Sequence, residues 1–355
     1  MINVTKTFLP PIDDYVSTLK RAWDKAWITN NGELALELEE KLKSYLGVRN
    51  LLFCGNGTIV LQMALKAFDI TGEVITTPFS YVATTTAILW ENCKPVFVDI
   101  NKSNFCIDPS KIEAAITTKT QAILATHVYG YPCDVTEIER IARKHQLKVI
   151  YDGAHAFGTK INGRSLLDYG DISTCSFHAT KLFHTVEGGC ILTPDDELLK
   201  KLFLYKHFGH IGDEYFSIGI NGKNSEFHAA MGICNLNYIG DILAKRKKSW
   251  TNYANALRNA SYEILNIPET IEYNYAYFPF VFESEKELLS KMNVFQRKGI
   301  KPRRYFYPSL NRLPYFLGEP CPNSESIAQR VVCLPLFHDI TELEQDTIVS
   351  VLLEG

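Results

Sequence analysis

Four short segments of the sequence carry residue types that could do chemistry, and each directly follows an apolar run. In residues 55–58, glycines would let backbone N–H groups approach an anion, and the helical pattern that begins there favours negative charge at its start. Taken alone, this segment is better explained as a tight strand-to-helix turn. Neither GxGxxG nor GxxxxGK[ST] occurs in the sequence, so neither a dinucleotide fold nor a P-loop is indicated.

Two further segments offer an aromatic ring and a carboxylate. Tyr81 ends residues 78–81 and could stack on a flat ring, although a half-buried core aromatic is the commoner case. Asp152 follows the apolar residues 149–151, and an acid at the end of a buried strand is costly unless it has a partner. A protonated pyridine nitrogen would be such a partner. Taken singly, a helix N-cap or a metal-binding aspartate explains Asp152 better.

The fourth segment, residues 176–181, ends in a lysine. Lys181 lies beside an expected strand end in a neutral stretch, and it is well placed to have a pKa below that of a solvated lysine. A neutral amine can form a Schiff base. Two glycines at 188 and 189 would let the chain turn sharply after it. The alternative is an ordinary surface lysine.

Together the four segments are more specific than any one of them. Ser176 and Lys181 follow Asp152 by 24 and 29 residues, and each candidate lies just beyond an expected strand. They supply an anion cradle, a stacking aromatic, an acid for a ring nitrogen and an amine. This is the equipment of a pyridoxal 5'-phosphate (PLP) site, in which the paired pyridinium acts as an electron sink.

The elements that position these residues alternate between strands and helices from about residue 31 to 205. The expected strands are residues 51–54, 74–77, 95–100, 122–126, 149–151, 173–177 and 190–193. Such apolar strands between helices indicate a mostly parallel sheet covered on both faces. Ligands of such sheets bind beyond the carboxyl ends of the strands, where the four segments lie.

One expected helix precedes the first strand. Asn31 is its expected N-cap and Gly47 its end, with ion pairs Glu37–Lys41 and Glu39–Lys43 on the wet side. A second expected helix, residues 134–145, has Asp134 as its cap.

The pattern changes after residue 235. A basic helix containing residues 245–248 comes first, and its cations are expected to form a solvated face. An aromatic strand at 273–282, a helix at 286–298 and a loop at 301–322 follow. We therefore expect a large α/β domain at residues 1–235 and a smaller α+β domain at residues 236–355.

Composition excludes several classes of function. The chain has 355 residues, of which 46% are apolar and 22% charged, and a formal net charge of −3. This balance argues against nucleic acid or a membrane surface as the main partner. The nine scattered cysteines form no CxxC and suit no closed disulfide framework, so free, mostly buried thiols in the cytoplasm are expected. No credible Cys/His set indicates a metal site.

Residues 77–84, 176–181 and 225–232 carry a family resemblance over nearly the whole chain. The sequence resembles the sugar-nucleotide aminotransferases of the DegT/DnrJ/EryC1/StrS type. The resemblance implies the PLP-dependent aspartate-aminotransferase fold (type I), an α/β fold with a mostly parallel seven-stranded sheet. Within the family the chain looks most like enzymes that act on dTDP-4-dehydro-6-deoxyglucose.

The resemblance also implies roles for the candidate residues. Lys181 would hold PLP as a Schiff base and then shuttle the proton, and Asp152 would pair with the pyridine nitrogen. His155 would sit near the ring hydroxyl and Tyr81 would stack on the ring. The phosphate would be bound by Gly57, Thr58 and Ser176 and by Asn221 of the neighbouring subunit, which implies an obligate homodimer with shared active sites.

A further set of residues lies in family segments near the sugar nucleotide. This set comprises Asn30, Lys223, Arg303, Arg304 and Tyr305. Lys223 and one of the two arginines could offset the diphosphate charge, but a solvent-facing basic loop explains the arginines equally well. Asn224 departs from the family, which usually has a hydrophobic residue three positions after the equivalent of Asn221.

The implied reaction is dTDP-4-dehydro-6-deoxy-D-glucose plus L-glutamate to dTDP-4-amino-4,6-dideoxy-D-glucose plus 2-oxoglutarate, with pyridoxamine phosphate (PMP) as the intermediate. A surface glycan such as O-antigen or lipopolysaccharide is the pathway expected of the family. Amination at C-3 of a dTDP-3-keto-6-deoxyhexose is the nearest alternative, because the motifs serve the cofactor. A related dehydratase would replace Lys181 by His. A PLP-binding regulator would need a DNA-binding module, and the first 30 residues contain none.

Overall fold

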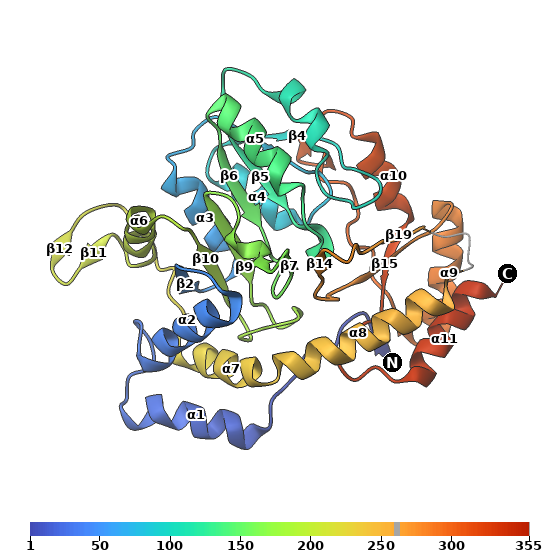
Figure 1. The fold of residues 1–355 in the computed structure, drawn as a ribbon, viewed down its shortest axis with the longest axis horizontal. Coiled ribbons are helices and arrows are strands. Elements are labelled where there is room, and N and C mark those ends of the chain that lie inside the picture. Colours follow the sequence, from blue (N-terminus) through green and yellow to red (C-terminus); the bar gives the residue numbers. More distant parts are fainter. Residues whose placement is uncertain (259–262, 355) are drawn as a thin grey trace.

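A seven-stranded sheet forms the centre of the molecule in the computed structural model, which describes residues 1–258 and 263–354 (Figure 1). Its strands, in chain order, are β2 (Leu51–Cys54), β3 (Glu73–Thr76), β4 (Lys94–Phe97), β5 (Thr120–Thr126), β6 (Lys148–Asp152), β9 (Ile172–Ser176) and β10 (Gly189–Leu192). The spatial order is β2-β10-β9-β6-β5-β3-β4, and only the two pairings of β10 are antiparallel. The seven expected strands and the mostly parallel sheet are confirmed.

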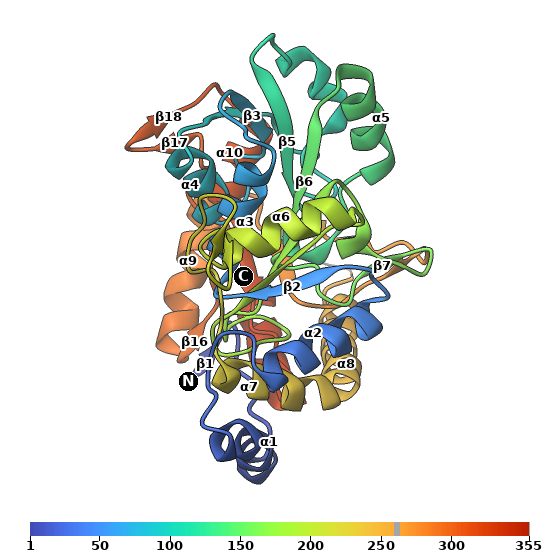
Figure 2. The same ribbon diagram turned by 90° about the vertical axis from the view of Figure 1, so that its left-hand side faces the viewer.

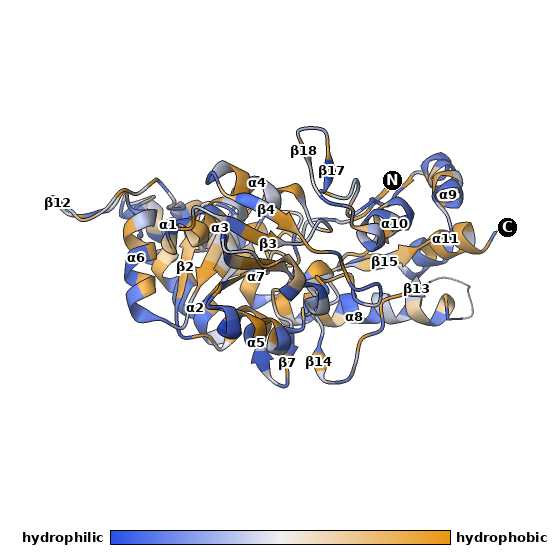
Figure 3. Cartoon of the chain, turned by 90° about the horizontal axis from the view of Figure 1, so that it is seen from above, coloured by the Kyte–Doolittle hydropathy of each residue, from blue (hydrophilic) through white to orange (hydrophobic). Residues whose placement is uncertain are grey.

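Helices cover both faces of this sheet. The helices are α2 (Glu33–Leu46), α5 (Val135–His145) and α7 (Glu226–Asn237) on one face, and α3 (Gly57–Ala67), α4 (Val82–Trp90) and α6 (Asp196–Lys206) on the other. In β6, Val149 and Tyr151 enter the first core and Ile150 enters the second. The strands are therefore apolar on both faces, as the orange interior in Figure 3 shows. Figure 2 shows α6 next to β2, the strand at one edge of the sheet.

Helix α2 corrects two sequence-based predictions. Its N-cap is Gly32 and not Asn31, and the missing cap is replaced by the carboxylate of Glu226, which accepts hydrogen bonds from the backbone N–H groups at the start of α2. The pair Glu37–Lys41 forms at 3.7 Å, but Glu39 binds the buried amine of Lys206 instead of Lys43. The end at Gly47 is confirmed, since this glycine takes the left-handed conformation (φ 65°).

The C-terminal part forms a third core around a small antiparallel sheet. Its strands are β13 (Glu263–Ile264), β15 (Phe278–Val281) and β19 (Val331–Leu334), and its helices are α8 (Ile239–Ala256), α9 (Glu285–Arg297) and α11 (Glu342–Leu353). Helix α10 (Pro322–Arg330) packs Ile327 and Ala328 into the first core instead. The aromatic strand is shorter than the predicted 273–282. The predicted boundary after residue 235 falls inside α7. We propose the α7–α8 junction as the division between domains, since the third core draws its helical residues from α8 onward.

The basic run of α8 is only partly solvated. Arg246 is 5% exposed, and its guanidinium donates to the backbone carbonyls of Tyr275 (3.1 Å) and Ala276 (2.6 Å). The prediction of a wholly solvated face was wrong for this residue, because α8 packs against the segment that leads into β15. A buried cation with two carbonyl partners fixes that segment.

The first residues of the chain tie the C-terminal part to the large sheet. Strand β1 (Ile2–Asn3) pairs with β16 (Ile300–Lys301), and the Val4 carbonyl accepts from the Leu336 N–H. The Thr7 hydroxyl then donates to the Ala179 carbonyl, and the Phe8 carbonyl lies 2.6 Å from His184 Nε2. Helix α1 (Ile12–Asp24) follows and packs on α7.

Short elements complete the fold. A small sheet is formed by β7 (Lys160–Ile161), β8 (Arg164–Ser165) and β14 (Ile271–Glu272). There are two hairpins, one of β11 (His210–Ile211) and β12 (Glu214–Tyr215) and one of β17 (Arg312–Leu313) and β18 (Phe316–Leu317). Turns of 3₁₀ helix lie at Pro109–Lys111, Glu113–Ala115, Val128–Gly130 and Leu166–Asp168. The β11–β12 hairpin projects from the body in Figure 1. All nine cysteines are buried free thiols, as expected. Within the described residues, no helix is long and apolar enough to span a membrane.

Candidate active site

A cavity of about 260 Å³ lies at the edge of the large sheet where β5, β6 and β9 end. The residues that line it are Asn56, Gly57, Thr58, Leu61, Ser80, Tyr81, Ala83, Thr126, Asp152, Ala154, His155, Ser176, His178, Thr180, Lys181, Glu187, Tyr277, Arg303, Tyr305 and Phe306. The cavity thus brings together the four segments singled out in the sequence, as the rule for open α/β sheets requires.

Asp152 ends β6 and is 5% exposed. Its Oδ1 accepts a hydrogen bond from the Ala154 N–H (3.0 Å), and its Oδ2 accepts one from the Thr84 hydroxyl (2.7 Å). Each carboxylate oxygen can accept a second hydrogen bond, so acceptor capacity remains on the cavity side. The buried acid can therefore bind a cationic N–H group in the cavity.

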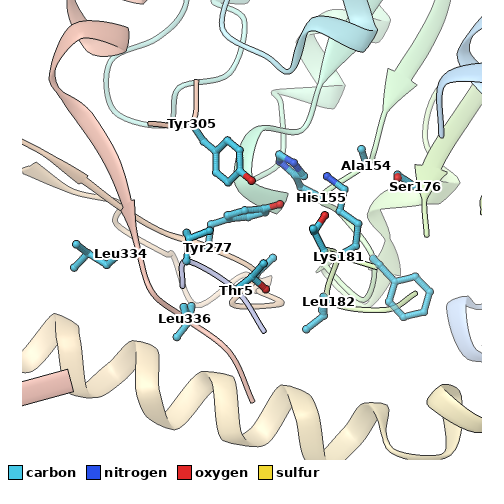
Figure 4. A pocket seen from close by; sticks show the side chains of 14 residues that line it. Thr5, Ala154, His155, Ser176, Lys181, Leu182, Tyr277, Tyr305, Leu334 and Leu336 are labelled. Atoms are coloured by element: carbon cyan, nitrogen blue, oxygen red, sulfur yellow. The ribbon is translucent and has the colours of Figure 1, made fainter. Parts of the chain in front are cut away.

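Lys181 stands on the loop after β9, where its N–H donates to the His178 carbonyl (2.8 Å). Burial lowers the pKa of its amine below the usual 10.5, while the negative charge of Asp152 opposes that shift. A second cavity of about 20 Å³ shares this lysine. Figure 4 shows the hydroxyl ends of Tyr277 and Tyr305 directed toward Lys181 and His155. Burial therefore makes the neutral form of this amine easier to reach than in a solvated lysine.

The ring of His155 is held in one orientation. Its Nδ1 accepts a hydrogen bond from the backbone N–H of Tyr129 (3.2 Å), so Nδ1 carries no proton and the remaining proton is on Nε2. Tyr129 adopts a left-handed backbone (φ 57°), which is rare for an aromatic residue. Phe306 stacks on the imidazole with 5° between the planes, and burial holds the pKa of His155 well below 6.5. His155 is a neutral donor.

The anion cradle lies at the N-terminus of α3. Asn56, which the sequence analysis did not single out, is the N-cap, and its side chain accepts from the N–H groups of Thr58 (3.0 Å) and Ile59 (2.9 Å). A Cβ on Gly57 would lie 2.7 Å from the Cβ of Ser176, so only glycine permits this approach of α3 to β9. Gly57, Thr58 and Ser176 are thus side by side, as their proposed common ligand requires.

The residues predicted near the sugar nucleotide separate into two groups. Arg303 and Tyr305 line the cavity, with the guanidinium carbon 5.0 Å from the tyrosine ring centroid. Arg304 lies outside the lining and binds Glu285 (2.8 Å). Asn30, Asn221 and Lys223 are also outside it; the first two are exposed, and the Lys223 amine lies 4.6 Å from the Phe208 ring centroid.

Several lining residues were missed by the sequence analysis. His178 Nδ1 is 2.7 Å from the Thr180 hydroxyl, and its Nε2 is 3.4 Å from a Glu187 carboxylate oxygen. Ser80 and Thr126 line the cavity beside Asp152. Ser80 could have been found, because it directly precedes Tyr81 after the same strand. Within the described residues, no group of three or more His, Cys, Asp and Glu side chains could hold a metal ion.

Comparison with known proteins agrees with this geometry. Residues 12–353 match the profile of the DegT/DnrJ/EryC1/StrS aminotransferase family. The chain is 41% identical to a Shigella dysenteriae protein and 40% identical to an Escherichia coli protein, each named dTDP-4-amino-4,6-dideoxy-D-glucose transaminase, and both alignments cover 99% of this chain and 98% of the relative. It superimposes on the crystal structure of DesI in the presence of its TDP-sugar product with a TM-score of 0.94 and 29% identity, covering 99% of this chain and 92% of DesI.

Proposed function

Because this chain belongs to the DegT/DnrJ/EryC1/StrS aminotransferase family, we propose that it moves an amino group from L-glutamate to C-4 of dTDP-4-dehydro-6-deoxy-D-glucose. The products would be dTDP-4-amino-4,6-dideoxy-D-glucose and 2-oxoglutarate. The observation that carries the proposal is the meeting of Lys181 and Asp152 at one cavity. The names of the relatives that are 41% and 40% identical over the whole chain support the choice of substrate.

The residues of the cavity fit PLP as the cofactor, alternating with PMP. Asp152 is a buried acid that can accept further hydrogen bonds, which suits a pyridinium N–H. Gly57 lies so close to Ser176 that a Cβ would not fit between them, and this keeps the N-terminus of α3 open to the phosphate. Lys181 would bind the group covalently and Asp152 would pair with its ring nitrogen. When bound, PLP supplies an electron sink for the bonds at the amino-bearing carbon.

The surroundings of each of these side chains are consistent with the catalytic or binding role proposed for it. Lys181 would take the α-proton of the donor, and its lowered pKa favours the neutral amine that can accept a proton. His155 would donate from Nε2 to the ring hydroxyl, because its Nδ1 is already an acceptor. Tyr81 would cover one ring face. Gly57 and Thr58 would bind the phosphate together with Ser176.

Binding of the nucleotide sugar needs cationic groups for the diphosphate. Arg303 is the cavity's candidate, since a guanidinium binds phosphate oxygens in a bidentate fashion. Arg304 is engaged by Glu285 and by the carbonyls of Ala328 and Gln329, which leaves it little capacity for substrate. Tyr305, Asn30 and Lys223 complete the proposed substrate set.

We propose that two chains form a homodimer in which each completes the other's site. Asn221 is exposed and outside the cavity of its own chain, while Tyr81 is 56% exposed although it lines the cavity. An open side of this kind suits Asn221 of the partner subunit as a further phosphate ligand. We place the protein in the cytoplasm and its product in the synthesis of a surface glycan such as O-antigen.

Product identification tests the proposed function. The purified protein is incubated with PLP, L-glutamate and dTDP-4-dehydro-6-deoxy-D-glucose, and mass spectrometry and NMR locate the new nitrogen. An amine at C-4 is expected. If the protein forms PMP from glutamate yet aminates only a 3-keto sugar, the C-4 assignment is wrong and amination at C-3 replaces it. Failure to form PMP would overturn the transamination itself.

A further inference from the structure

Three buried hydroxyl groups form a row that ends on the carboxylate of Asp152. The Thr84 hydroxyl lies 2.7 Å from Asp152 Oδ2, the Ser80 hydroxyl 2.7 Å from that of Thr84, and the Thr126 hydroxyl 3.1 Å from that of Ser80. None of these residues is more than 5% exposed. They come from the end of β5, from the segment between β3 and α4, from α4 and from the end of β6.

Simple counting of protons gives the row one direction. An ionised carboxylate only accepts hydrogen bonds, so Thr84 must donate its single proton to Asp152. Ser80 must then donate to Thr84, and Thr126 must donate to Ser80. Hydrogen bonds aligned in this way polarise one another. The row therefore delivers a strengthened donor to one oxygen of a buried acid.

The other oxygen of Asp152 is held as well, because it accepts from the Ala154 N–H. Both oxygens are thus fixed by donors on the protein side, and their remaining lone pairs are oriented by these two hydrogen bonds. Donors to a buried carboxylate stabilise its charged form against the cost of desolvation. A charged, oriented Asp152 before ligand binding is what recognition of a cationic ring nitrogen requires.

We propose that Thr84 is a positioning residue for Asp152, oriented in turn by Ser80 and Thr126. The inference rests on the proposed function, since it concerns how this acid meets PLP. Thr85, the next residue of α4, is 1% exposed, and its hydroxyl has no hydrogen-bond partner among the described residues. A buried hydroxyl on α4 therefore does not acquire a partner simply because it is buried. Thr85 therefore offers a matched control.

Isosteric variants separate the hydroxyl from the shape of the side chain. Thr84→Val removes the donor and keeps the volume, Thr84→Ser keeps the donor, and Thr85→Val removes a hydroxyl without a partner. For each apo-protein we would measure PLP affinity by equilibrium dialysis, and for each holoenzyme the pH dependence of the cofactor's visible absorption and the kcat and KM for L-glutamate. Circular dichroism and thermal unfolding check that each variant is folded.

Thr84→Val is expected to bind PLP about tenfold more weakly, the factor that corresponds to 1.4 kcal/mol. Its absorption pH profile should shift, and kcat should fall about tenfold with the KM for L-glutamate within about twofold of wild type. Thr84→Ser and Thr85→Val should resemble wild type. Ser80→Ala should weaken PLP binding about two- to threefold, because Thr84 keeps its proton for Asp152 but loses its orientation.

Two results would overturn the role of Thr84. One is a Thr84→Val protein that matches wild type in PLP affinity and absorption. The other is equal loss in Thr84→Val and Thr85→Val, which would assign the effect to packing. If Thr84→Val does not fold, Ser80→Ala takes its place, and wild-type behaviour of that variant overturns the row. A wild-type protein that does not bind PLP would instead refute the proposed function, so the two failures are distinguishable.

Discussion

Arg303 and Arg304 are neighbours in the chain but have different surroundings. Arg303 lines the cavity, where its guanidinium faces the Tyr305 ring. Arg304 is anchored to Glu285 on α9 and to carbonyl groups at the end of α10. At the scale of single residues, identity alone therefore does not assign a function, whereas the partners of each side chain do.

Alanine variants of the two arginines should behave differently. Arg303→Ala is expected to raise the KM for the nucleotide sugar at least about tenfold with little change in kcat, because a charge-assisted contact to phosphate is lost in ground and transition state alike. Arg304→Ala should leave that KM unchanged and lower the free energy of unfolding by about 1 kcal/mol, because the partly buried Ala328 carbonyl and the Glu285 carboxylate lose their donor. Steady-state kinetics and urea unfolding measure both. A larger KM effect at Arg304 would reverse the assignment.

At the scale of elements, caps and ion pairs come from distant parts of the chain. The start of α2 is capped by Glu226, whose partner Leu34 is 192 residues away, because Gly32 at the N-cap has no side chain. The buried Lys206 likewise joins α6 to Glu39 of α2 and to the Phe53 carbonyl of β2. These contacts fix the position of α2 and β2 beside the cradle.

The Glu226 cap gives a prediction about stability. Glu226→Ala should lower the free energy of unfolding by about 3 kcal/mol, because two buried backbone N–H groups at the positive end of α2 lose a charged acceptor. Glu33→Gln is the control at the same helix end: its ion pairs with Arg21 and Lys25 are exposed to solvent, so little change in the free energy of unfolding is expected. Chemical denaturation distinguishes the two. Equal effects would show that Glu226 is not the cap of α2.

Elements with a strong local pattern were predictable from the sequence, and contacts between elements were not. The strand Leu51–Cys54 was found because four apolar residues stand between a glycine-ended helix and a Gly-rich turn. The position of Asp152, Lys181 and Gly57 after strand ends followed from the same pattern. The hydroxyl row on Asp152 could not be foreseen, because its members meet only when three strand ends are brought together. Arg246 was misjudged for the same reason, since the sequence does not show what packs on α8.

At the scale of the whole molecule, buried histidines tie stability to pH. His127 is fully buried, its Nδ1 accepts from the Cys133 N–H (3.1 Å) and its ring stacks on Tyr151. Burial lowers its pKa from 6.5 to about 3. Since the unfolded chain then binds a proton that the folded chain does not, the stabilising contribution is fully present above pH 6.5 and is lost as the pH falls toward 3.

The pH dependence of unfolding tests this reading of His127. Between pH 6.5 and 5, this residue alone should reduce the free energy of unfolding by about 2 kcal/mol. His127→Asn keeps an acceptor for the Cys133 N–H but has no proton to bind in this range. Its stability curve should therefore be flatter than that of wild type by that amount. Parallel curves for the two proteins would show that His127 is protonated equally in both states.

The proposed shared active site can be tested by mixing two inactive variants. Lys181→Ala should lose at least about a thousandfold in kcat while staying folded, because the only proposed proton carrier at the donor carbon is removed. Asn221→Ala should bind PLP so weakly that it is inactive at the PLP concentration of the assay. Co-refolded mixtures should regain about one quarter of wild-type activity, because half of the dimers are hybrids and each hybrid has one intact site. No recovery in hybrids isolated by two successive affinity steps, with a different tag on each variant, would place Asn221 outside the partner's site.

The first eight residues have a practical consequence for handling this protein. They join β16, the Leu336 backbone, the Ala179 carbonyl beside Lys181, and His184. One short stretch of chain therefore touches the first core, the third core and the loop that bears the reactive amine. A purification tag or fusion partner is therefore better attached after α11, which ends at the periphery of the molecule in Figure 1 and is contacted there by the exposed Lys298 and by Lys291 of α9 rather than by the reactive loop. Removal of the first eight residues would take away the Thr7–Ala179 hydrogen bond to the amine-bearing loop, together with Val4 and Thr5, which line the smaller cavity beside Lys181.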